Sequence, residues 1–198
     1  MRGMTVIKLE MDLQIKTASG ELSVWRTLDG KVFWSFKEEG GGGSIIVPYA
    51  FIDQQFYVGM LLQHRPNQDG WTLNIPRGGK RKGETHMQAA ERELAEELGI
   101  SSSSLTILDG DPMNPNSTHF KTSGDDGVQV FACELDSNLI IFDGILGLYK
   151  IDPFIVCRNK SMDDEGVEDC YLLPWKIATK VGDMFSLAAI SRLLAKII

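Results

Sequence analysis

One segment, from Gly78 to Ile100, constrains the fold of this chain more than any other. A glycine-rich loop comes first and is followed by charged and apolar residues at helical spacing. Thr85 and Gln88 form the pair that a capping box needs at the start of a helix, and Gly99 suits the left-handed residue that ends one. The spacing therefore predicts a helix from Thr85 to Gly99 that follows directly on a tight loop.

Three carboxylates of this helix, those of Glu93, Glu96 and Glu97, are predicted to crowd onto one face. An α-helix turns about 100° per residue, so side chains three and four positions apart are neighbours. Like charges at that spacing destabilise a helix by roughly 0.2–0.5 kcal/mol per pair, and the helix dipole disfavours negative charge near the C-terminal end. A divalent cation bound by the carboxylate oxygens would reverse this balance, so the pattern indicates a metal site. The alternative, a solvent-facing acidic helix, explains neither the glycine loop nor acids placed against the dipole.

The rest of the helix is patterned to hold this acidic face in place. Four apolar side chains fall on one stripe at helical spacing and are predicted to pack on a core: Met87, Ala90, Leu94 and Leu98. Arg92 precedes Glu96 by four residues, which places the two within reach of an ion pair that would fix the carboxylate.

Gly78, Glu84 and the run from Arg92 to Ile100 together resemble a complete Nudix box, with no fixed position of the motif missing. The resemblance implies a pyrophosphohydrolase that depends on Mg²⁺ or Mn²⁺ and cleaves a nucleoside diphosphate linked to another group. It also implies an α/β fold, in which helices sandwich a mixed β-sheet.

The same resemblance implies a set of metal ligands. Glu93 and Glu97 are expected to be the principal ligands, with Glu96 as a further ligand or as an acceptor just outside the metal's own shell. The backbone carbonyl of Arg77 is expected to complete the site, by analogy with the family branch described next.

Residues before the box narrow the resemblance to the ADP-ribose and ADP-sugar pyrophosphatase branch. Gln63–Pro66, Trp71 and Ile75–Gly78 are similar to that branch's run in front of the box. The branch implies ADP-ribose or another nucleoside diphosphate sugar as substrate, cleaved to a nucleoside monophosphate and a sugar phosphate. It also implies a homodimer whose N-terminal strands cross to the partner. Two positions depart from the branch, because Asn74 and Arg77 stand where it usually has Glu and Ala.

Four further residues are expected to take part in catalysis. Arg92 is expected to position a carboxylate, and Glu84 to orient a ligand or accept a hydrogen bond from the loop. The general base of this branch often comes from a loop well after the box, which makes Glu165 the first candidate here and Glu168 the second. A solvated acidic loop is the alternative for these last two residues.

Cations and backbone near the glycine loop are expected to bind the substrate. Arg65 and Arg77 have guanidinium groups suited to bidentate contact with phosphate oxygens. Gly78 and Gly79 let the backbone approach a phosphate closely. Three aromatic residues of the N-terminal segment are candidates for stacking on adenine, although core packing is the more common use of such side chains: Phe33, Trp34 and Phe36. Trp71 is expected in the core.

Two other functions stay open at this stage. One is Nudix hydrolysis of nucleoside triphosphates, dinucleoside polyphosphates or a capped RNA end. The other is a non-catalytic, nucleotide-binding regulatory domain. The intact set of carboxylates argues against it, because such a domain does not need a metal site. A formal net charge of −7 over 198 residues argues against nucleic-acid binding as the main function.

The cysteine content and the lengths of the apolar runs indicate where the protein is located. Three cysteines without CxxC spacing, and no secretory signal, indicate reduced thiols and a cytoplasmic protein. No apolar run reaches the length of a membrane span.

Gly40–Gly43 marks a predicted boundary within the chain. Residues 1–43 are predicted as an N-terminal β-hairpin segment for dimerisation or substrate binding, and residues 44–198 as the Nudix domain. Residues 136–162 are predicted to hold an inserted strand or helix, or a dimer contact, because long structureless loops are uncommon in compact domains. The other elements are predicted as strands near 45–50, 56–63, 71–75, 104–109 and 128–135, and as helices within 174–197.

Overall fold

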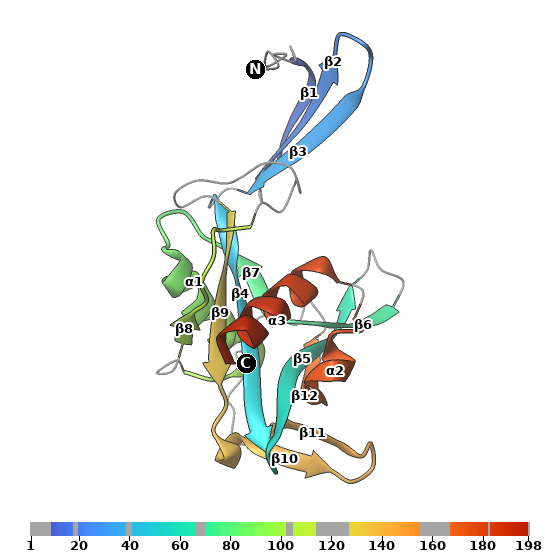
Figure 1. The fold of residues 1–198 in the computed structure, drawn as a ribbon. Coiled ribbons are helices and arrows are strands. Elements are labelled where there is room, and N and C mark those ends of the chain that lie inside the picture. The colour runs from blue at the N-terminus through green and yellow to red at the C-terminus, as the bar shows by residue number, and fades with distance from the viewer. Residues whose placement is uncertain are drawn as a thin grey trace.

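The computed structural model describes residues 9–17, 20–38, 41–65, 70–101, 105–113, 127–154, 167–181 and 183–197. Its strands form a three-stranded antiparallel sheet and a nine-stranded mixed sheet (Figure 1). The larger sheet lies between the helices, and the smaller sheet stands beyond the end of the larger one at which β4 begins (Figure 1).

The smaller sheet confirms the strand pattern predicted before the glycine run. It contains three strands in chain order: β1 (Leu9–Thr17), β2 (Gly20–Thr27) and β3 (Val32–Glu38). Leu13 pairs with Val24 and Ile15 with Leu22, and residues paired across strands share a face of the sheet. The side chains of Leu13 and Ile15 are exposed, so this apolar face has no core behind it within the described residues.

The larger sheet is built around β4. Its nine strands are β4 (Gly42–Ile52), β5 (Gln55–Arg65), β6 (Gly70–Asn74), β7 (Arg77–Gly79), β8 (Leu105–Ile107), β9 (Gly127–Glu134), β10 (Ile140–Asp143), β11 (Leu148–Ile151) and β12 (Val167–Pro174). The order is β10-β11-β12-β5-β4-β9-β8, with β6 added to β5 and β7 added to β4. Among the described strands only β4 and β9 pair in parallel. The start of β4 pairs with β7 and its end with β5, which brings the glycine loop against the beginning of the central strand.

Alternate residues of β4 point into two different cores. Ile45 and Val47 pack into a cluster with Ile190 and Leu193 of α3 (Met184–Ile197). The neighbouring Ile46 and Ala50 pack on the other face, into a cluster completed by three residues of the acidic helix: Ala90, Leu94 and Leu98. A strand covered on both faces reads as a nearly continuous apolar run, as β4 does. The α/β architecture with a mixed sheet between helices is thereby confirmed.

The glycine run overlaps the start of the central strand. Gly42 and Gly43 belong to β4, and a Cβ on Gly42 would overlap the backbone of Gly127 in β9. A Cβ on Gly43 would lie 2.5 Å from the carbonyl oxygen of Gly78. These two glycines therefore serve close backbone packing inside the sheet, while the boundary at Gly40–Gly43 stays a prediction.

The predicted insertion after β9 is a β-hairpin. A 3₁₀ turn, η3 (Ser137–Leu139), leads into β10 and β11, which extend the sheet beyond β12. Lys150 of β11 pairs with Asp143 (3.1 Å) and Asp169 (3.4 Å). The inserted-strand alternative is thus confirmed, while a dimer contact stays a prediction.

The acidic helix begins as predicted but does not continue as an α-helix. The Thr85–Gln88 capping box opens α1 (His86–Glu93), and Gly99 ends the helical segment with φ of 69°. Between them lies η2 (Leu94–Leu98), a π-helical turn. The prediction for Met87 was wrong, since this residue is exposed.

Two helices near the end of the chain confirm the helical pattern predicted there, and they are α2 (Trp175–Ala178) and α3. None of the helices in the described ranges is long and apolar enough to cross a lipid bilayer.

Leu98→Ala should lower the free energy of unfolding by about 2–5 kcal/mol, because the fully buried side chain leaves a cavity in the core under the helix. Met87→Ala, on the exposed side of the same helix, should change it by less than about 0.5 kcal/mol. Urea unfolding measures both variants, and equal losses would contradict the packing described here.

Candidate active site

Arg92 is the hub of the acidic cluster. Its Nε donates to Glu84 Oε1 at 2.9 Å and its Nη2 to Glu84 Oε2 at 3.2 Å. Its Nη1 donates to Glu96 Oε2 at 2.9 Å and also to Glu93 Oε1. Nη2 further donates to the carbonyl oxygen of Gly79 at 2.8 Å. One guanidinium therefore ties three carboxylates to the glycine loop, and the predicted Arg92–Glu96 ion pair is present.

The charges within this cluster stabilise one another. Burial acts to lower the pKa of Arg92, but hydrogen bonds and charges from Glu84, Glu93 and Glu96 outweigh it and raise this pKa above its ordinary value. The pKa of Glu84 is lowered, chiefly by the hydrogen bond from Arg92 and also by the backbone N–H of Arg81, at 2.7 Å. The loop contact expected of Glu84 is thus formed.

Glu93 and Glu97 are the buried acids of the cluster, with 5% and 4% of their surface exposed. The backbone N–H of Arg77 donates to Glu97 Oε2 at 3.0 Å. The carboxylate of Glu93 lies against Gly78, where a Cβ would overlap it. Two carboxylates of one helix are thereby held against β7, where the glycine loop begins, and the absent side chain of Gly78 makes room for one of them.

These two carboxylates suit a magnesium-type site. Among the described residues, no three side chains of Asp, Glu, His or Cys come together closely enough to hold a metal by themselves. Mg²⁺ is usually bound by one or two carboxylates, with water and substrate phosphates supplying the other oxygens. Buried carboxylates are also costly unless a cation accompanies them. The donor set therefore fits a hard divalent cation.

Glu96 differs from its two neighbours. One of its oxygens accepts from Arg92 and the other from Arg81 Nη2 at 3.1 Å. Both oxygens are thus engaged by arginines. Of the two roles expected for this residue, the geometry favours the acceptor that holds Arg92 in place.

Both positions at which the chain departs from the ADP-sugar branch are engaged with other residues. Asn74 is buried and donates from Nδ2 to Thr72 Oγ1 at 2.8 Å. Arg77 Nη1 donates to Asp183 Oδ1 and Oδ2 at 3.0 and 2.9 Å, and its guanidinium lies 5.2 Å from the ring centre of Phe185. Trp71, expected in the core, is exposed and packs against His64.

Asp183 and Ser186 join the site without having been predicted from the sequence. Asp183 accepts hydrogen bonds from the backbone N–H and the hydroxyl of Ser186 at the start of α3. Burial acts to raise the pKa of Asp183, but these bonds and the charge of Arg77 outweigh it and lower the pKa. An Asp placed three residues before a Ser at a helix start is a capping signal that was available in the sequence. Its pairing with Arg77 was not, because 106 residues separate the two.

Several predicted site residues, or their side chains, lie outside the part of the chain that the structure describes. Glu165 lies outside the described residues, and so does the rest of the acidic run before β12. For Arg65 and Glu168 the backbone belongs to β5 and β12, but their side chains are not among those described. The same holds for the aromatic residues of β3. Their roles stay predictions.

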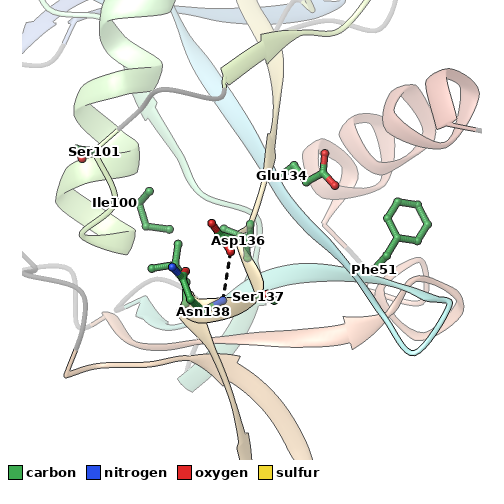
Figure 2. Close-up of a pocket in the computed structure, with 9 residues that line it drawn as sticks. Phe51, Ile100, Ser101, Glu134, Asp136, Ser137 and Asn138 are labelled. Atoms are coloured by element: carbon green, nitrogen blue, oxygen red, sulfur yellow. Dashed lines mark hydrogen bonds between the residues drawn. The ribbon is translucent and has the colours of Figure 1, made fainter.

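A cavity of about 700 Å³ opens at the opposite end of β4 from the glycine loop. Ile100 and Ser101, which follow the acidic helix, belong to the lining of this cavity, and Figure 2 shows Ile100 pointing toward Asn138, with Phe51 well apart from them. Glu134 and Asp136 give its lining negative charge, which is unsuited to a diphosphate. This cavity is therefore not the site organised by Arg92.

Arg92→Ala, measured with a chelator present, should lower the free energy of unfolding by about 2–4 kcal/mol, because it leaves carboxylates buried without their counter-charge. Arg81→Ala removes an arginine whose side chain is 65% exposed and should cost less than about 1 kcal/mol. Chemical denaturation of both variants checks this, and a loss for Arg92→Ala as small as that for Arg81→Ala would refute its role as hub.

Comparison with solved structures places this arrangement in a known fold. A crystal structure of an ADP compounds hydrolase superposes with a TM-score of 0.57 at 12% identity, covering 97% of this chain and 92% of that chain. A Nudix hydrolase of Listeria monocytogenes gives 0.51 at 18% identity, covering 78% of this chain and 92% of that one. The Nudix domain of Shewanella oneidensis NrtR, complexed with ADP ribose, gives 0.50 at 16% identity, covering 79% and 87%. At these identities the likeness shows a shared fold.

Sequence comparison gives the family itself. No curated protein matches the chain. The family model described as the NUDIX domain matches residues 46–144, which include the later part of β4, the glycine loop and the acidic helix. The chain therefore belongs to the Nudix family and, with it, to the pyrophosphohydrolases.

Proposed function

We propose that this Nudix pyrophosphohydrolase cleaves ADP-ribose or another nucleoside diphosphate sugar to a nucleoside monophosphate and a sugar phosphate. The observation that carries the proposal is the pair of buried carboxylates, Glu93 and Glu97, held at the glycine loop. The ADP compounds hydrolase and the ADP-ribose-bound NrtR domain share the fold and support the choice of substrate class.

Glu93 and Glu97 would hold Mg²⁺ or Mn²⁺, with the carbonyl oxygen of Arg77 as a further ligand and Glu96 beside them. Such an ion, when bound, neutralises the diphosphate and lowers the pKa of a coordinated water. The protein itself holds the carboxylates in fixed positions. Arg92 holds the carboxylates of Glu93 and Glu96 in place, so little reorganisation is needed as substrate binds.

Binding of the diphosphate would fall to the cations and backbone around the loop. Gly78 and Gly79 allow the close backbone approach that a phosphate needs, and Arg65 would add a charged contact. Asp183 already engages Nη1 of Arg77. Arg77 would therefore contact phosphate only through its other N–H groups.

Glu165, with Glu168 as second choice, would accept the proton of the attacking water. That water attacks one phosphorus, and the bond from this phosphorus to the bridging oxygen breaks. Glu84 would act indirectly, because it accepts hydrogen bonds from Arg92 and from the backbone N–H of Arg81 in the loop.

We further propose that the protein acts as a homodimer in the cytoplasm. The apolar face of the smaller sheet, with exposed Leu13 and Ile15, supports pairing with a second copy, because exposed apolar surface of this kind marks interaction sites. Within the described residues, Cys133 and Cys170 are buried and form no disulfide, which suits a reducing compartment.

Glu97→Gln should lower Mg²⁺-dependent hydrolysis of ADP-ribose by about two orders of magnitude while the fold is retained, because the variant loses a charged ligand. Glu91→Gln alters an exposed acid of the same helix and should keep wild-type turnover. The assay covers ADP-ribose, nucleoside diphosphate sugars, dinucleoside polyphosphates and nucleoside triphosphates. Full activity of Glu97→Gln would refute the ligand assignment; tight binding without turnover of any substrate would indicate a regulatory domain.

Glu165→Gln should lower kcat by about 10²–10⁴-fold and abolish the acid limb of its pH profile, because the amide cannot accept the proton. Asp164→Asn, in the same acidic run, is the matched control and should keep both. If turnover and acid limb are unchanged in Glu165→Gln, the base is another residue, with Glu168 next to be tested.

A further inference from the structure

Three consecutive residues in front of the glycine loop are each fixed by a different element. The backbone N–H of Ile75 donates to Ser186 Oγ of α3 at 3.1 Å. The carbonyl oxygen of Pro76 accepts from the N–H of Ile46 in β4 at 2.9 Å. The backbone N–H of Arg77 donates to Glu97 Oε2 at 3.0 Å. The chain therefore enters the loop with its main chain held from α3, from the central strand and from the acidic helix.

Asp183 joins two of these attachments. Its carboxylate accepts from Arg77 Nη1 and from the hydroxyl and N–H of Ser186. Ser186 is fully buried. Its hydroxyl accepts a hydrogen bond from the N–H of Ile75 and donates one to the carboxylate of Asp183, so it connects the two. A satisfied buried network of this kind rigidifies the segments that it joins.

The Arg77 end of the network is also largely withdrawn from solvent. The side chains of Arg77 and Asp183 are 21% and 19% exposed, and the guanidinium lies over Phe185. Charge-assisted bonds in such a setting are shorter and stronger than neutral ones. Arg77 is thus held by its side chain to α3 and by its backbone to Glu97, which makes it the physical link between the two.

We propose that Asp183 is a positioning residue for the metal site, acting through Arg77 on the backbone at residue 77 and on the carboxylate of Glu97. The proposal rests on the proposed function, in which Glu97 and the carbonyl of Arg77 hold the cation. Under this proposal α3, which packs on one face of the larger sheet, helps to position the carboxylate of Glu97, which belongs to the helix on the opposite face. The ion pair with Asp183 requires an arginine at position 77, where the similar branch usually has Ala.

Asp183→Asn is the direct test. The amide oxygen still accepts from Ser186, but the charge opposite Arg77 is lost. Groups that orient metal ligands typically contribute 10- to 100-fold to metal affinity, so the variant should bind Mn²⁺ about tenfold more weakly. Electron paramagnetic resonance of free Mn²⁺ measures this without substrate. At saturating metal, kcat should stay within about threefold of wild type, because the ligands themselves are intact.

Asp143→Asn is a matched control at a distance from the site. Asp143 is 16% exposed, pairs with Lys150 at 3.1 Å and accepts the backbone N–H groups of Ile145 and Leu146. Its pKa is lowered, as is that of Asp183. Loss of this carboxylate should lower Tm by a similar amount and leave Mn²⁺ affinity within about twofold of wild type. A purely structural role for Asp183 would make the two variants behave alike, and that result would overturn the proposal.

The route through Arg77 is tested by a double-mutant cycle. Arg77→Ala removes the guanidinium but keeps the backbone, so it should weaken Mn²⁺ binding about as much as Asp183→Asn. The variant with both changes should be no weaker than Arg77→Ala alone, because the second change has nothing left to disturb. Fully additive losses would overturn the route. If wild-type protein binds no Mn²⁺ at all, the proposed function itself fails, an outcome distinct from either of these.

Discussion

Burial of like charges is the constraint on which the site depends. Glu93 and Glu97 lie on one helix, nearly out of contact with water, where each would destabilise the fold without compensation. Arg92 supplies one positive charge and shares it among Glu84, Glu93 and Glu96. The remaining negative charge is the reason to expect a divalent cation here, and the glycine loop gives the space in which to hold one.

The π-helical turn links this electrostatic feature to the packing. Leu94 and Leu98 are fully buried against the sheet, while Glu97, between them, is also buried and turned toward the loop. A wider turn redistributes side chains around the helix axis, and such turns are frequent at functional sites. The apolar and acidic sides of the helix are therefore both tied to neighbouring structure, one by the core and the other by Arg77 and Gly78.

Local rules predicted much of this arrangement. The capping box, the left-handed Gly99 and the Arg92–Glu96 pair follow from spacing along one helix, and the apolar run of β4 follows from burial on both faces. The π-turn did not follow, because the prediction used a constant 100° per residue. Met87 lies in α1, ahead of that turn, and its place on the predicted apolar stripe did not imply burial. The pairing of Arg77 with Asp183, and the packing of Gly42 against Gly127, depend on contacts between distant segments that no local pattern encodes.

The proposed site places a divalent cation between Glu93 and Glu97 beside the glycine loop. The most direct measurement is anomalous X-ray scattering from crystals of the protein grown with Mn²⁺. We expect a strong peak within bonding distance of both carboxylates. Ordered density for both side chains with no peak between them, or a peak only at another place in the molecule, would contradict it.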